Sequence, residues 1–270
     1  MTLTLLRAAV LGLVQGATEF LPISSSAHLV LTSALLGWED QGLLFDMAAN
    51  TGSLVAVVFY FRRDLLRLAR AWIASLRRDP SGDRAAAGLA WQLLLATVPV
   101  ALVGLLLQDL VARSARRLLV IASATMVFGL VLGWADRAAR GGRRLDRLGL
   151  ARALAIGAAQ ALALVPGTSR SGITITAGLF TGLSREEAAR FAFLLAVPVG
   201  VLVGAKDLVE LVGSGPPPAG ILALAMGCTV SALSALAAIH WFLAWVRRQS
   251  LTVFVVYRLI LGLLIFALAV

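Results

Sequence analysis

The sequence predicts an all-α integral membrane protein. Of its 270 residues, 60% are hydrophobic and only 14% are charged. The mean hydropathy of +0.91 is far above that of a soluble domain, in which about half of the residues are apolar. Several apolar runs also reach the ~20 residues that an α-helix needs to cross a bilayer. The single cysteine, Cys228, excludes an internal disulfide.

Six apolar runs are expected to cross the membrane, at 45–61, 89–107, 118–134, 188–212, 219–246 and 251–270. Two further segments, at 1–37 and 150–183, are interrupted near their middle by proline, glycine and hydroxyl residues. We expect each of these to enter the membrane and return on the same side as a re-entrant helical hairpin. The breakers between the segments are Asp79, Pro80, Ser81 and Gly82, then Gly141 and Gly142, then the run at 213–218.

The arginines predict the orientation. With both hairpins re-entrant, seventeen arginines share one side: Arg62, Arg63, Arg67, Arg70, Arg77, Arg78, Arg84, Arg137, Arg140, Arg143, Arg144, Arg147, Arg152, Arg185, Arg190, Arg247 and Arg248. Four lie on the other side: Arg7, Arg113, Arg116 and Arg117. The positive-inside rule then places both termini and the mouth of the first hairpin outside the cytoplasm. Because the arginines cluster in short loops between apolar spans, the net charge of +10 reflects topology and does not indicate a nucleic-acid partner.

The two halves resemble each other. "LGLVQGATEFLPISSSAHLVLTSALLG" and "IGAAQALALVPGTSRSGITITAGLFTG" both run apolar helix, Gln, Pro, hydroxyl cluster, apolar helix, Gly. We match Gln15 with Gln160 and Pro22 with Pro166, and we expect Ser25 opposite Ser169. Each half has one hairpin and three crossings, and three is odd, so the second copy must be inverted. The prediction is one membrane domain over 1–270, with an inverted repeat at about 1–140 and 148–270 and a site where the broken helices meet.

The first hairpin carries polar residues in a pattern that suits an anion site. An ionised Glu19 within a span costs at least ~2.5–3.5 kcal/mol, so this residue should face a pocket. Gln15 lies four residues earlier on the same helical face. After Pro22, residues Ser24, Ser25 and Ser26 open the next helix, and His28 can lie on their face.

The second hairpin supplies matching groups in its tip: Gly167, Thr168, Ser169, Arg170 and Ser171. Helix N-termini attract anions, and the planar donor fork of arginine suits phosphate. Glu19 with Gln15 would add hard oxygen ligands for Mg²⁺ or Ca²⁺. The pattern therefore predicts a phosphate pocket with a divalent cation. Ser25 or His28 could attack phosphorus, or His28 could act as general acid or base, and the sequence leaves this choice open.

Structural roles compete with these functional ones. Glu19 and Arg170 could form a purely structural ion pair, and Ser26 and Ser171 could only bond helices together. His240 has no polar companions and reads as a structural histidine. The remaining charged residues of the spans are expected to snorkel to the interface or to pair locally: Lys206, Asp207 and Arg258.

The motifs resemble those of the undecaprenyl-diphosphate phosphatases, also called bacitracin-resistance phosphatases. "QGATEFLPISSSAH" is similar to the family's Glu/Gln-x-x-x-Glu motif with the Ser-Ser and His that follow it, and "PGTSRSG" matches its second signature. "LFDMAANTGSLVAVVFYFRRDL", "LSREEAARFAFLLAVP" and "YRLILG" also look like family segments, so the resemblance covers nearly the whole chain. Three positions depart from the common pattern: Gln15 stands where many members have Glu, Asn50 where Gln or His is common, and Ala192 where Ser is common.

The resemblance implies an enzyme that hydrolyses undecaprenyl diphosphate to the monophosphate at the outer face of the bacterial cytoplasmic membrane, with a divalent cation. Such an enzyme recycles the lipid carrier for cell-wall synthesis and confers resistance to bacitracin, which sequesters the same substrate. The family's catalytic, metal and phosphate roles would fall on Gln15, Glu19, Ser25, His28 and Arg170. A homodimer is left open.

A transporter or flippase for an anionic lipid is the competing function, because inverted repeats with broken helices are typical of transporters. The Ser/His/Glu group beside a phosphate-binding arginine exceeds what binding alone requires, so the sequence favours the enzyme. An ion channel is disfavoured, since Glu19 and His28 have no charged or imidazole counterpart in the second half.

Overall fold

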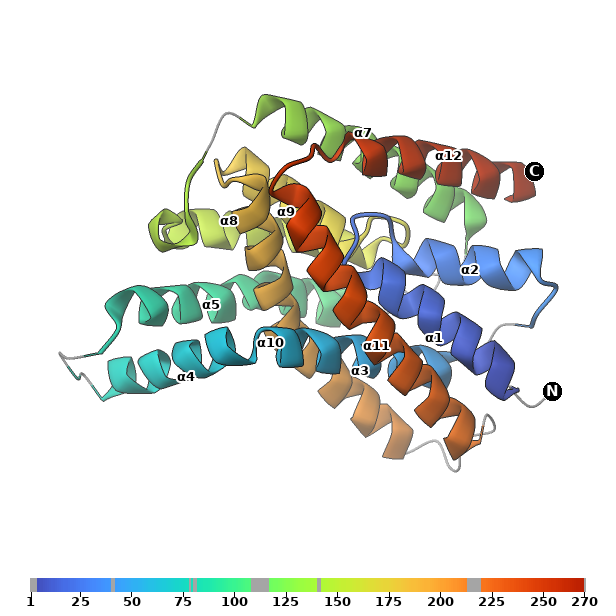
Figure 1. Cartoon of the computed structure of the whole chain (residues 1–270), viewed down its shortest axis with the longest axis horizontal. Helices are drawn as coiled ribbons and strands as arrows, with labels where there is room; N and C mark the ends of the chain where they lie inside the picture. Colours follow the sequence, from blue (N-terminus) through green and yellow to red (C-terminus); the bar gives the residue numbers. More distant parts are fainter. Residues whose placement is uncertain are drawn as a thin grey trace.

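The computed structural model describes residues 4–39, 42–77, 79, 82–107, 117–139, 142–212 and 220–269. The secondary-structure elements of these residues are all helices (Figure 1). The α-helices are α1 Leu5–Glu19, α2 Ser25–Leu35, α3 Leu43–Tyr60, α4 Arg62–Leu76, α5 Arg84–Leu106, α7 Leu118–Ala138, α8 Leu150–Gln160, α9 Arg170–Phe180, α10 Arg185–Val212, α11 Ile221–Val246 and α12 Thr252–Ala269. The described residues also include two 3₁₀ turns, η1 Leu145–Arg147 and η2 Ala161–Leu164. The all-α membrane class is confirmed.

Among the described residues, five helices are long and apolar enough to cross a membrane, and all five were expected. They are α5, α7, α10, α11 and α12. The sixth expected crossing, 45–61, is α3, which passes the same test only together with α4, and the two helices meet at a bend of 76°. Four arginines (Arg78, Arg113, Arg116 and Arg140) and the breakers Pro80, Ser81, Gly141 and 213–218 lie outside the described residues.

The segment after Phe61 is a helix, and the expectation of an arginine-rich loop there was wrong. Leu65, Leu68 and Trp72 recur at helical spacing and form one apolar face of α4. The helix is therefore amphipathic, and it packs against α5. At the start of α5, Asp83 accepts hydrogen bonds from the Ala86 amide at 3.0 Å and from Arg67 Nε at 2.7 Å. The backbone bond and then the arginine lower the pKa of the Asp83 carboxyl.

The two interrupted segments form helix–tip–helix units with short arms. Arms α2, α8 and α9 have 11 residues each, about 16 Å at 1.5 Å per residue, which is too short for a hydrocarbon core of about 30 Å. The expected pairing of Ser25 with Ser169 is wrong by one residue. The N-caps are Ser24 and Ser169, so Ser25 corresponds to Arg170, and one gap-free offset also aligns Gln15 with Gln160. The same offset places Pro22 opposite Gly167, so its expected match with Pro166 is also wrong by one residue.

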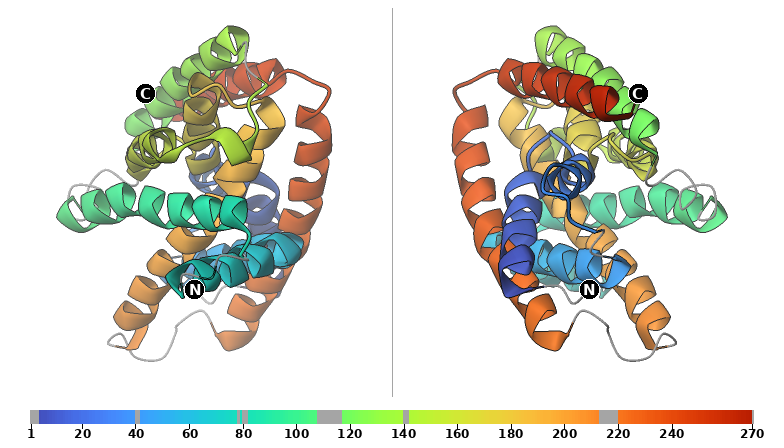
Figure 2. Two further views of the ribbon diagram at one scale, coloured as in Figure 1. Left: turned by 90° about the vertical axis from the view of Figure 1, so that its left-hand side faces the viewer. Right: turned by 90° about the vertical axis from the view of Figure 1, so that its right-hand side faces the viewer.

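Each unit packs on a long helix from the other half of the chain: α1 lies against α11, and α8 lies against α5 (Figure 2). Small residues make the approach close. A Cβ at Gly12 would lie 2.5 Å from the Gly227 carbonyl oxygen, and one at Gly157 would lie 2.1 Å from that of Ala96. Such small-residue contacts let membrane helices pack through their backbones. The two hairpin tips consequently meet at the centre of the molecule.

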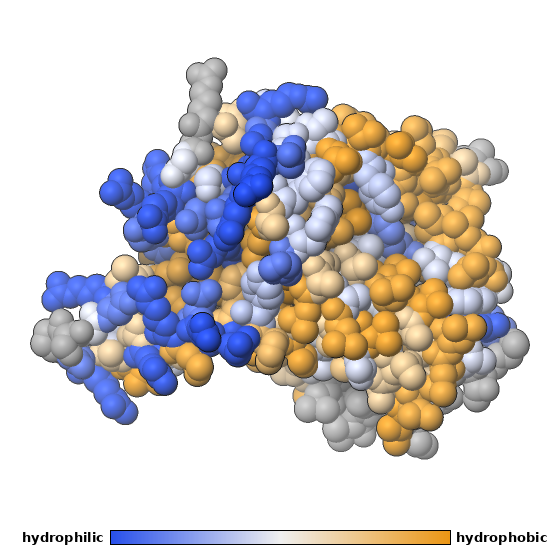
Figure 3. All heavy atoms as spheres, viewed as in Figure 1, coloured by the Kyte–Doolittle hydropathy of each residue, from blue (hydrophilic) through white to orange (hydrophobic). Residues whose placement is uncertain are grey.

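Polar and apolar surfaces segregate along the molecule (Figure 3). Hydrophilic side chains gather at the end that holds α4 and the start of α5, whereas the end that holds both termini is mainly hydrophobic (Figures 1 and 3). A partly buried ion pair lies outside the hairpin tips: the buried Asp136 of α7 accepts from Arg185 of α10 and, at 3.0 Å, from the Leu251 amide. It ties α7 to α10 and to the residue directly before α12, and it has no part in the pocket described next.

Candidate active site

Both hairpin tips use the same unusual backbone conformation. Ser24 has φ of 73° and Ser169 has φ of 72°, and these are the two described residues other than glycine with positive φ. A left-handed serine is strained by its Cβ, so the surrounding structure must hold it in place. At each tip the serine hydroxyl lies 3.2 Å from that of the serine two residues on, Ser26 or Ser171. The two tips are therefore built alike.

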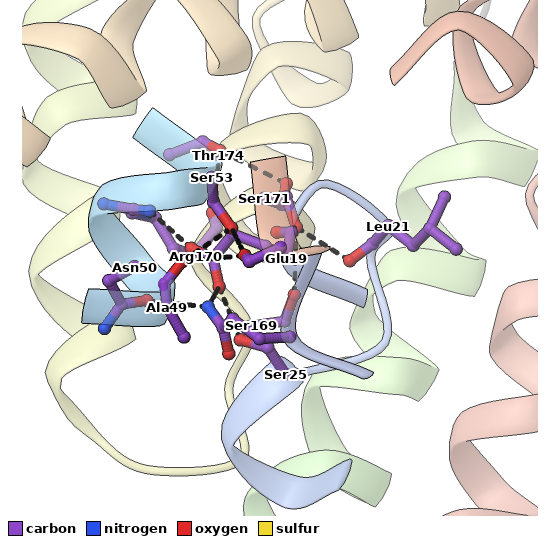
Figure 4. A network of polar contacts seen from close by, with 12 residues as sticks. Glu19, Leu21, Ser25, Ala49, Asn50, Ser53, Ser169, Arg170, Ser171 and Thr174 are labelled. Atoms are coloured by element: carbon purple, nitrogen blue, oxygen red, sulfur yellow. Dashed lines mark hydrogen bonds and ion pairs between the residues drawn. The ribbon is translucent and has the colours of Figure 1, made fainter. Parts of the chain in front are cut away.

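Glu19 is the centre of a polar network that joins the two hairpins (Figure 4). Arg170 donates to Glu19 Oε1 in an ion pair. Ser25 Oγ donates to Oε2 at 2.6 Å, and Gln15 Nε2 donates to the same oxygen at 2.9 Å. The Glu19 side chain is only 9% exposed, so screening by water is weak and these bonds fix its position. The expected meeting of Glu19 and Arg170 across the hairpins is confirmed.

A cavity of about 130 Å³ opens beside this network. Its lining includes most of the predicted site: Glu19, Ser24, Ser25, Ser26, Gly167, Ser169 and Arg170, with Ala163 and Val165. Helices α2 and α9 both begin at this cavity, and their first-turn N–H groups are suited to an anion. Together with the Arg170 guanidinium, they give the cavity the kind of donors that a phosphate group requires. The Ser25 hydroxyl is already bonded to a carboxylate that can take its proton.

His28 is held apart from Glu19 and Arg170. Its Nδ1 lies 2.7 Å from the Ser24 carbonyl oxygen, and its Nε2 lies 2.6 Å from the Tyr257 hydroxyl. A carbonyl can only accept, so Nδ1 carries the hydrogen and Nε2 accepts from Tyr257. The two rings also stack, with centroids 5.5 Å apart. The residues that line the cavity do not include His28, and its contact with the site runs through the Ser24 backbone.

Of the other predicted residues of the second tip, Gly167 lines the cavity, whereas Thr168 and Ser171 do not. Ser171 Oγ donates to the backbone oxygens of Glu19, at 3.2 Å, and Leu21, at 2.9 Å, so this hydroxyl bonds one hairpin to the other. Thr168 is fully buried, and its hydroxyl has no partner among the described residues. Gly167 has φ of 91°, and a Cβ there would lie 2.3 Å from the Ile121 carbonyl oxygen. Only glycine fits at that position.

The donor set fits a cation that also binds a phosphate. Among the described residues no group of three or more His, Cys, Asp or Glu side chains could hold a metal. The site instead offers one carboxylate, Glu19, and two amides, since Gln15 Nε2 also donates to Asn50 Oδ1 at 2.6 Å. Mg²⁺ commonly takes one or two carboxylates, keeps several waters and completes its shell with substrate phosphates. Gln15, Glu19 and Asn50 meet that requirement only with the substrate as an additional ligand.

Three residues of the site were missed or misplaced by the sequence. Asn50 was left without a role and bonds Gln15, and Tyr257 was not singled out and bonds His28. Arg258 was expected to snorkel or pair locally, which is wrong: it is fully buried and donates to backbone carbonyls of both tips. A charged residue inside a span is by default a sign of function, and that signal was present in the sequence.

Comparison with known proteins identifies the family of the chain. The family model for the bacitracin resistance protein BacA matches residues 8–264. A curated undecaprenyl-diphosphatase of Magnetococcus marinus is 52% identical over 265 residues, which are 97% of this chain and 98% of the relative. The matched stretch contains both hairpins, so the site lies wholly within it. The chain therefore belongs to the bacitracin resistance protein BacA family.

Proposed function

We propose that this protein is an integral membrane phosphatase that hydrolyses undecaprenyl diphosphate to undecaprenyl phosphate and inorganic phosphate. The observation that carries the proposal is Glu19, whose two carboxylate oxygens hold the Ser25 hydroxyl and the Arg170 guanidinium at one cavity. The nucleophile Ser25, its base Glu19 and the phosphate-binding guanidinium of Arg170 thus lie together between two helix N-termini. The extensive identity with a protein named undecaprenyl-diphosphatase supports the substrate.

The geometry favours Ser25 as the nucleophile over the alternatives, His28 and water. Ser25 Oγ attacks the terminal phosphorus while its proton passes to Glu19 Oε2, 2.6 Å away. The bond from that phosphorus to the bridging oxygen breaks, and undecaprenyl phosphate leaves. Water then cleaves the phosphoserine, which releases inorganic phosphate and restores the Ser25 hydroxyl. Arg170 and the N–H groups of α2 and α9 stabilise the charge that develops on the phosphoryl oxygens.

A divalent cation, Mg²⁺ or Ca²⁺, would be held by Glu19 and by the amide oxygens of Gln15 or Asn50. When bound it would offset the charge of the diphosphate and polarise its phosphoryl oxygens. Gln15 orients Glu19 through its own hydrogen bond at 2.9 Å, so it serves the site with or without a direct bond to the cation.

The proposed membrane arrangement is an inverted repeat whose halves each contain one re-entrant hairpin. Three observations support it: the matched left-handed serines at 24 and 169, hairpin arms too short to cross, and the reciprocal packing of α1 on α11 and α8 on α5. Irregular backbone such as the two tips is tolerated at membrane depth only where it lines a polar cavity, and both tips do so.

The proposed orientation places the arginine-rich end in the cytoplasm of a bacterial cell and the termini outside. Both termini lie at the end of the molecule opposite α4, as the positive-inside rule requires (Figures 1 and 3). The cavity would then open toward the outer face of the cytoplasmic membrane, where bacitracin competes for the same lipid. A flippase remains the alternative, but the comparisons favour the phosphatase.

The test is phosphate release from a C55 or C15 prenyl diphosphate by the detergent-purified protein, with Mg²⁺, with Ca²⁺ and with EDTA. Glu19→Ala, His28→Ala and Arg170→Ala are assayed beside it, and gel filtration shows whether each is folded. We expect cation-dependent release by the wild type, its loss in Glu19→Ala and Arg170→Ala, and a smaller reduction in His28→Ala, because His28 contacts the site only through the Ser24 backbone. If the folded wild type released no phosphate with any of these cations, the proposed phosphatase activity would be contradicted. Transfer of intact lipid across vesicles would then support the flippase.

A further inference from the structure

Arg258 lies between the two hairpin tips, and its guanidinium is used entirely on backbone carbonyls. Nε donates to Thr125 O at 2.9 Å and Nη1 to Pro22 O at 3.2 Å. Nη2 lies 3.0 Å from Gly167 O, 2.9 Å from Thr168 O and 3.5 Å from Ala124 O. The side chain is fully buried, and in the described part of the chain no carboxylate pairs with it.

These carbonyls come from three separate segments. Pro22 lies in the first tip, two residues before the left-handed Ser24. Gly167 and Thr168 lie in the second tip, directly before Ser169 and Arg170. The third segment is α7, which contributes two carbonyls one residue apart. One planar group therefore fixes the first tip relative to the second and both relative to a membrane-spanning helix.

We infer that Arg258 is a positioning residue for the phosphatase reaction. It sets the spacing between the tips and hence places Ser25 and Glu19 of one hairpin against Arg170 of the other. The inference rests on the proposed function, since it names a determinant of that same site. Arg258 does not line the cavity, so it acts through the backbone that it holds and not by contact with the phosphate.

The choice of arginine follows from its donor geometry. A guanidinium presents five N–H groups in a rigid plane, whereas a lysine ammonium is a compact point charge with three donors. Lysine would keep the charge but could not reach carbonyls on two tips and a helix at once. A buried cation without a counter-ion is costly, and the fixed carbonyl dipoles that surround Arg258 offset that cost. A purely structural role in holding helices would be met by apolar packing at lower cost.

The helix opposite Arg258 is shaped to admit it. A Cβ at Gly129 of α7 would lie 3.1 Å from Arg258 Cβ and 3.3 Å from its Nε. One turn further along α7, a Cβ at Gly133 would lie 3.2 Å from Val255 Cγ1. Both glycines thus face α12 with similar clearance, but only Gly129 faces the arginine. Comparing substitutions at these two glycines therefore tests whether displacing Arg258 lowers kcat.

The first arm of the experiment compares Gly129→Ala with Gly133→Ala, using detergent-purified full-length protein and a C15 prenyl diphosphate. Both changes add one methyl group between α7 and α12, and neither touches a residue of the pocket. We expect kcat of Gly129→Ala to fall by roughly 10-fold or more, because small displacements of reacting groups cost that much. KM should change far less, and Gly133→Ala should retain the wild-type kcat even where its Tm falls.

The second arm compares Arg258→Lys with Arg185→Lys, which changes the same residue type in the ion pair with Asp136. We expect Arg258→Lys to lose kcat by roughly 10- to 100-fold at a Tm equal to that of Arg185→Lys, which stays active. In Arg258→Ala, added methylguanidinium should restore part of kcat, which lost packing alone would not show.

The outcomes separate the inference from the function beneath it. An inactive but folded wild type would overturn the proposed function. An active wild type with equal kcat in Gly129→Ala and Gly133→Ala would overturn only the positioning role of Arg258. A fall of kcat in all four variants in proportion to Tm would likewise overturn that role and leave the function standing. If Arg258→Lys fails to fold, the comparison of Gly129→Ala with Gly133→Ala still tests the positioning role of Arg258.

Discussion

Arg170 and Glu19 form an ion pair between two hairpins whose residues are 151 positions apart in the sequence. Each hairpin alone would bury a charge without a partner. The pair forms only when the tips of both hairpins meet, so the assembly of the fold and the assembly of the site are the same event. The Glu19 carboxylate also accepts hydrogen bonds from Ser25 and Gln15, so its negative charge holds three neighbouring side chains in place.

Replacing Glu19 with Gln should therefore abolish catalysis while it preserves shape. Without the charge, Ser25 loses its base and Arg170 its partner, and we expect kcat to fall by about 100- to 10,000-fold. Phosphate release from a prenyl diphosphate measures the effect. Asp64→Asn is the control, because the Asp64–Arg190 pair at 3.5 Å is partly exposed and remote from the cavity lining. Wild-type kcat in Glu19→Gln would exclude the carboxylate from the chemistry.

Ser25→Ala should reduce kcat by roughly 1,000-fold or more with little change in KM, as expected for loss of a nucleophile. Thr181→Ala removes a hydroxyl that bonds only within its own helix end, to Gly178 O, and should leave kcat unchanged. Mass spectrometry of quenched wild type should also show a phosphoryl group on Ser25. A Ser25→Ala protein that turns over normally would shift the attack to His28 or to water.

How far the sequence predicts this site depends on which interactions are local. Gln15 and Glu19 are four residues apart, and Ser24–Ser26 follow a proline, so helical spacing and breakers place them without any tertiary information. Asn50 and Tyr257 reach the site from α3 and α12, and neither lies near the two hairpin motifs in the sequence. Only the packing of distant helices brings them there.

The misreading of Arg258 has a similar cause. Near the start of an apolar helix, a long cationic side chain usually snorkels to the interface, and this expectation outweighed the functional signal of a charge inside a span. Its partners are backbone carbonyls, which leave no trace in a pattern of side chains. In α4 the arginines masked an amphipathic helix, because their number suggested a loop while the leucines at helical spacing carried the structure.

His28 should depend on Tyr257. The tyrosine hydroxyl, 2.6 Å from Nε2, fixes the imidazole tautomer and its orientation. Tyr257→Phe keeps the stacked ring and removes only this hydrogen bond, so we expect kcat to fall by about 3- to 10-fold. In a double-mutant cycle, Tyr257→Phe should cost nothing further once His28 is replaced by Ala. Additive losses would show that the two residues act independently.

Gln15→Glu should strengthen the binding of the divalent cation. A second carboxylate beside Glu19 adds the charge that hard cations prefer, so the Mg²⁺ concentration for half-maximal activity should fall by about tenfold. Without the cation, two adjacent carboxylates repel each other, and the variant's Tm in EDTA should drop below that of the wild type. An unchanged Mg²⁺ requirement would place the cation away from Gln15.

The orientation in the membrane can be checked by labelling single cysteines in a Cys228→Ser background. A cysteine at Arg70, on the exposed face of α4 at the arginine-rich end, should react with a membrane-impermeant maleimide only after the cells are lysed. A cysteine at Leu6, 72% exposed at the opposite end near the N-terminus, should react on intact cells where it clears the headgroups. The gradient of basic residues predicts this asymmetry, because arginine-rich loops are retained in the cytoplasm. Phosphate release by each labelled protein controls for correct insertion, and labelling of the Arg70 position on intact cells would reverse the proposed topology.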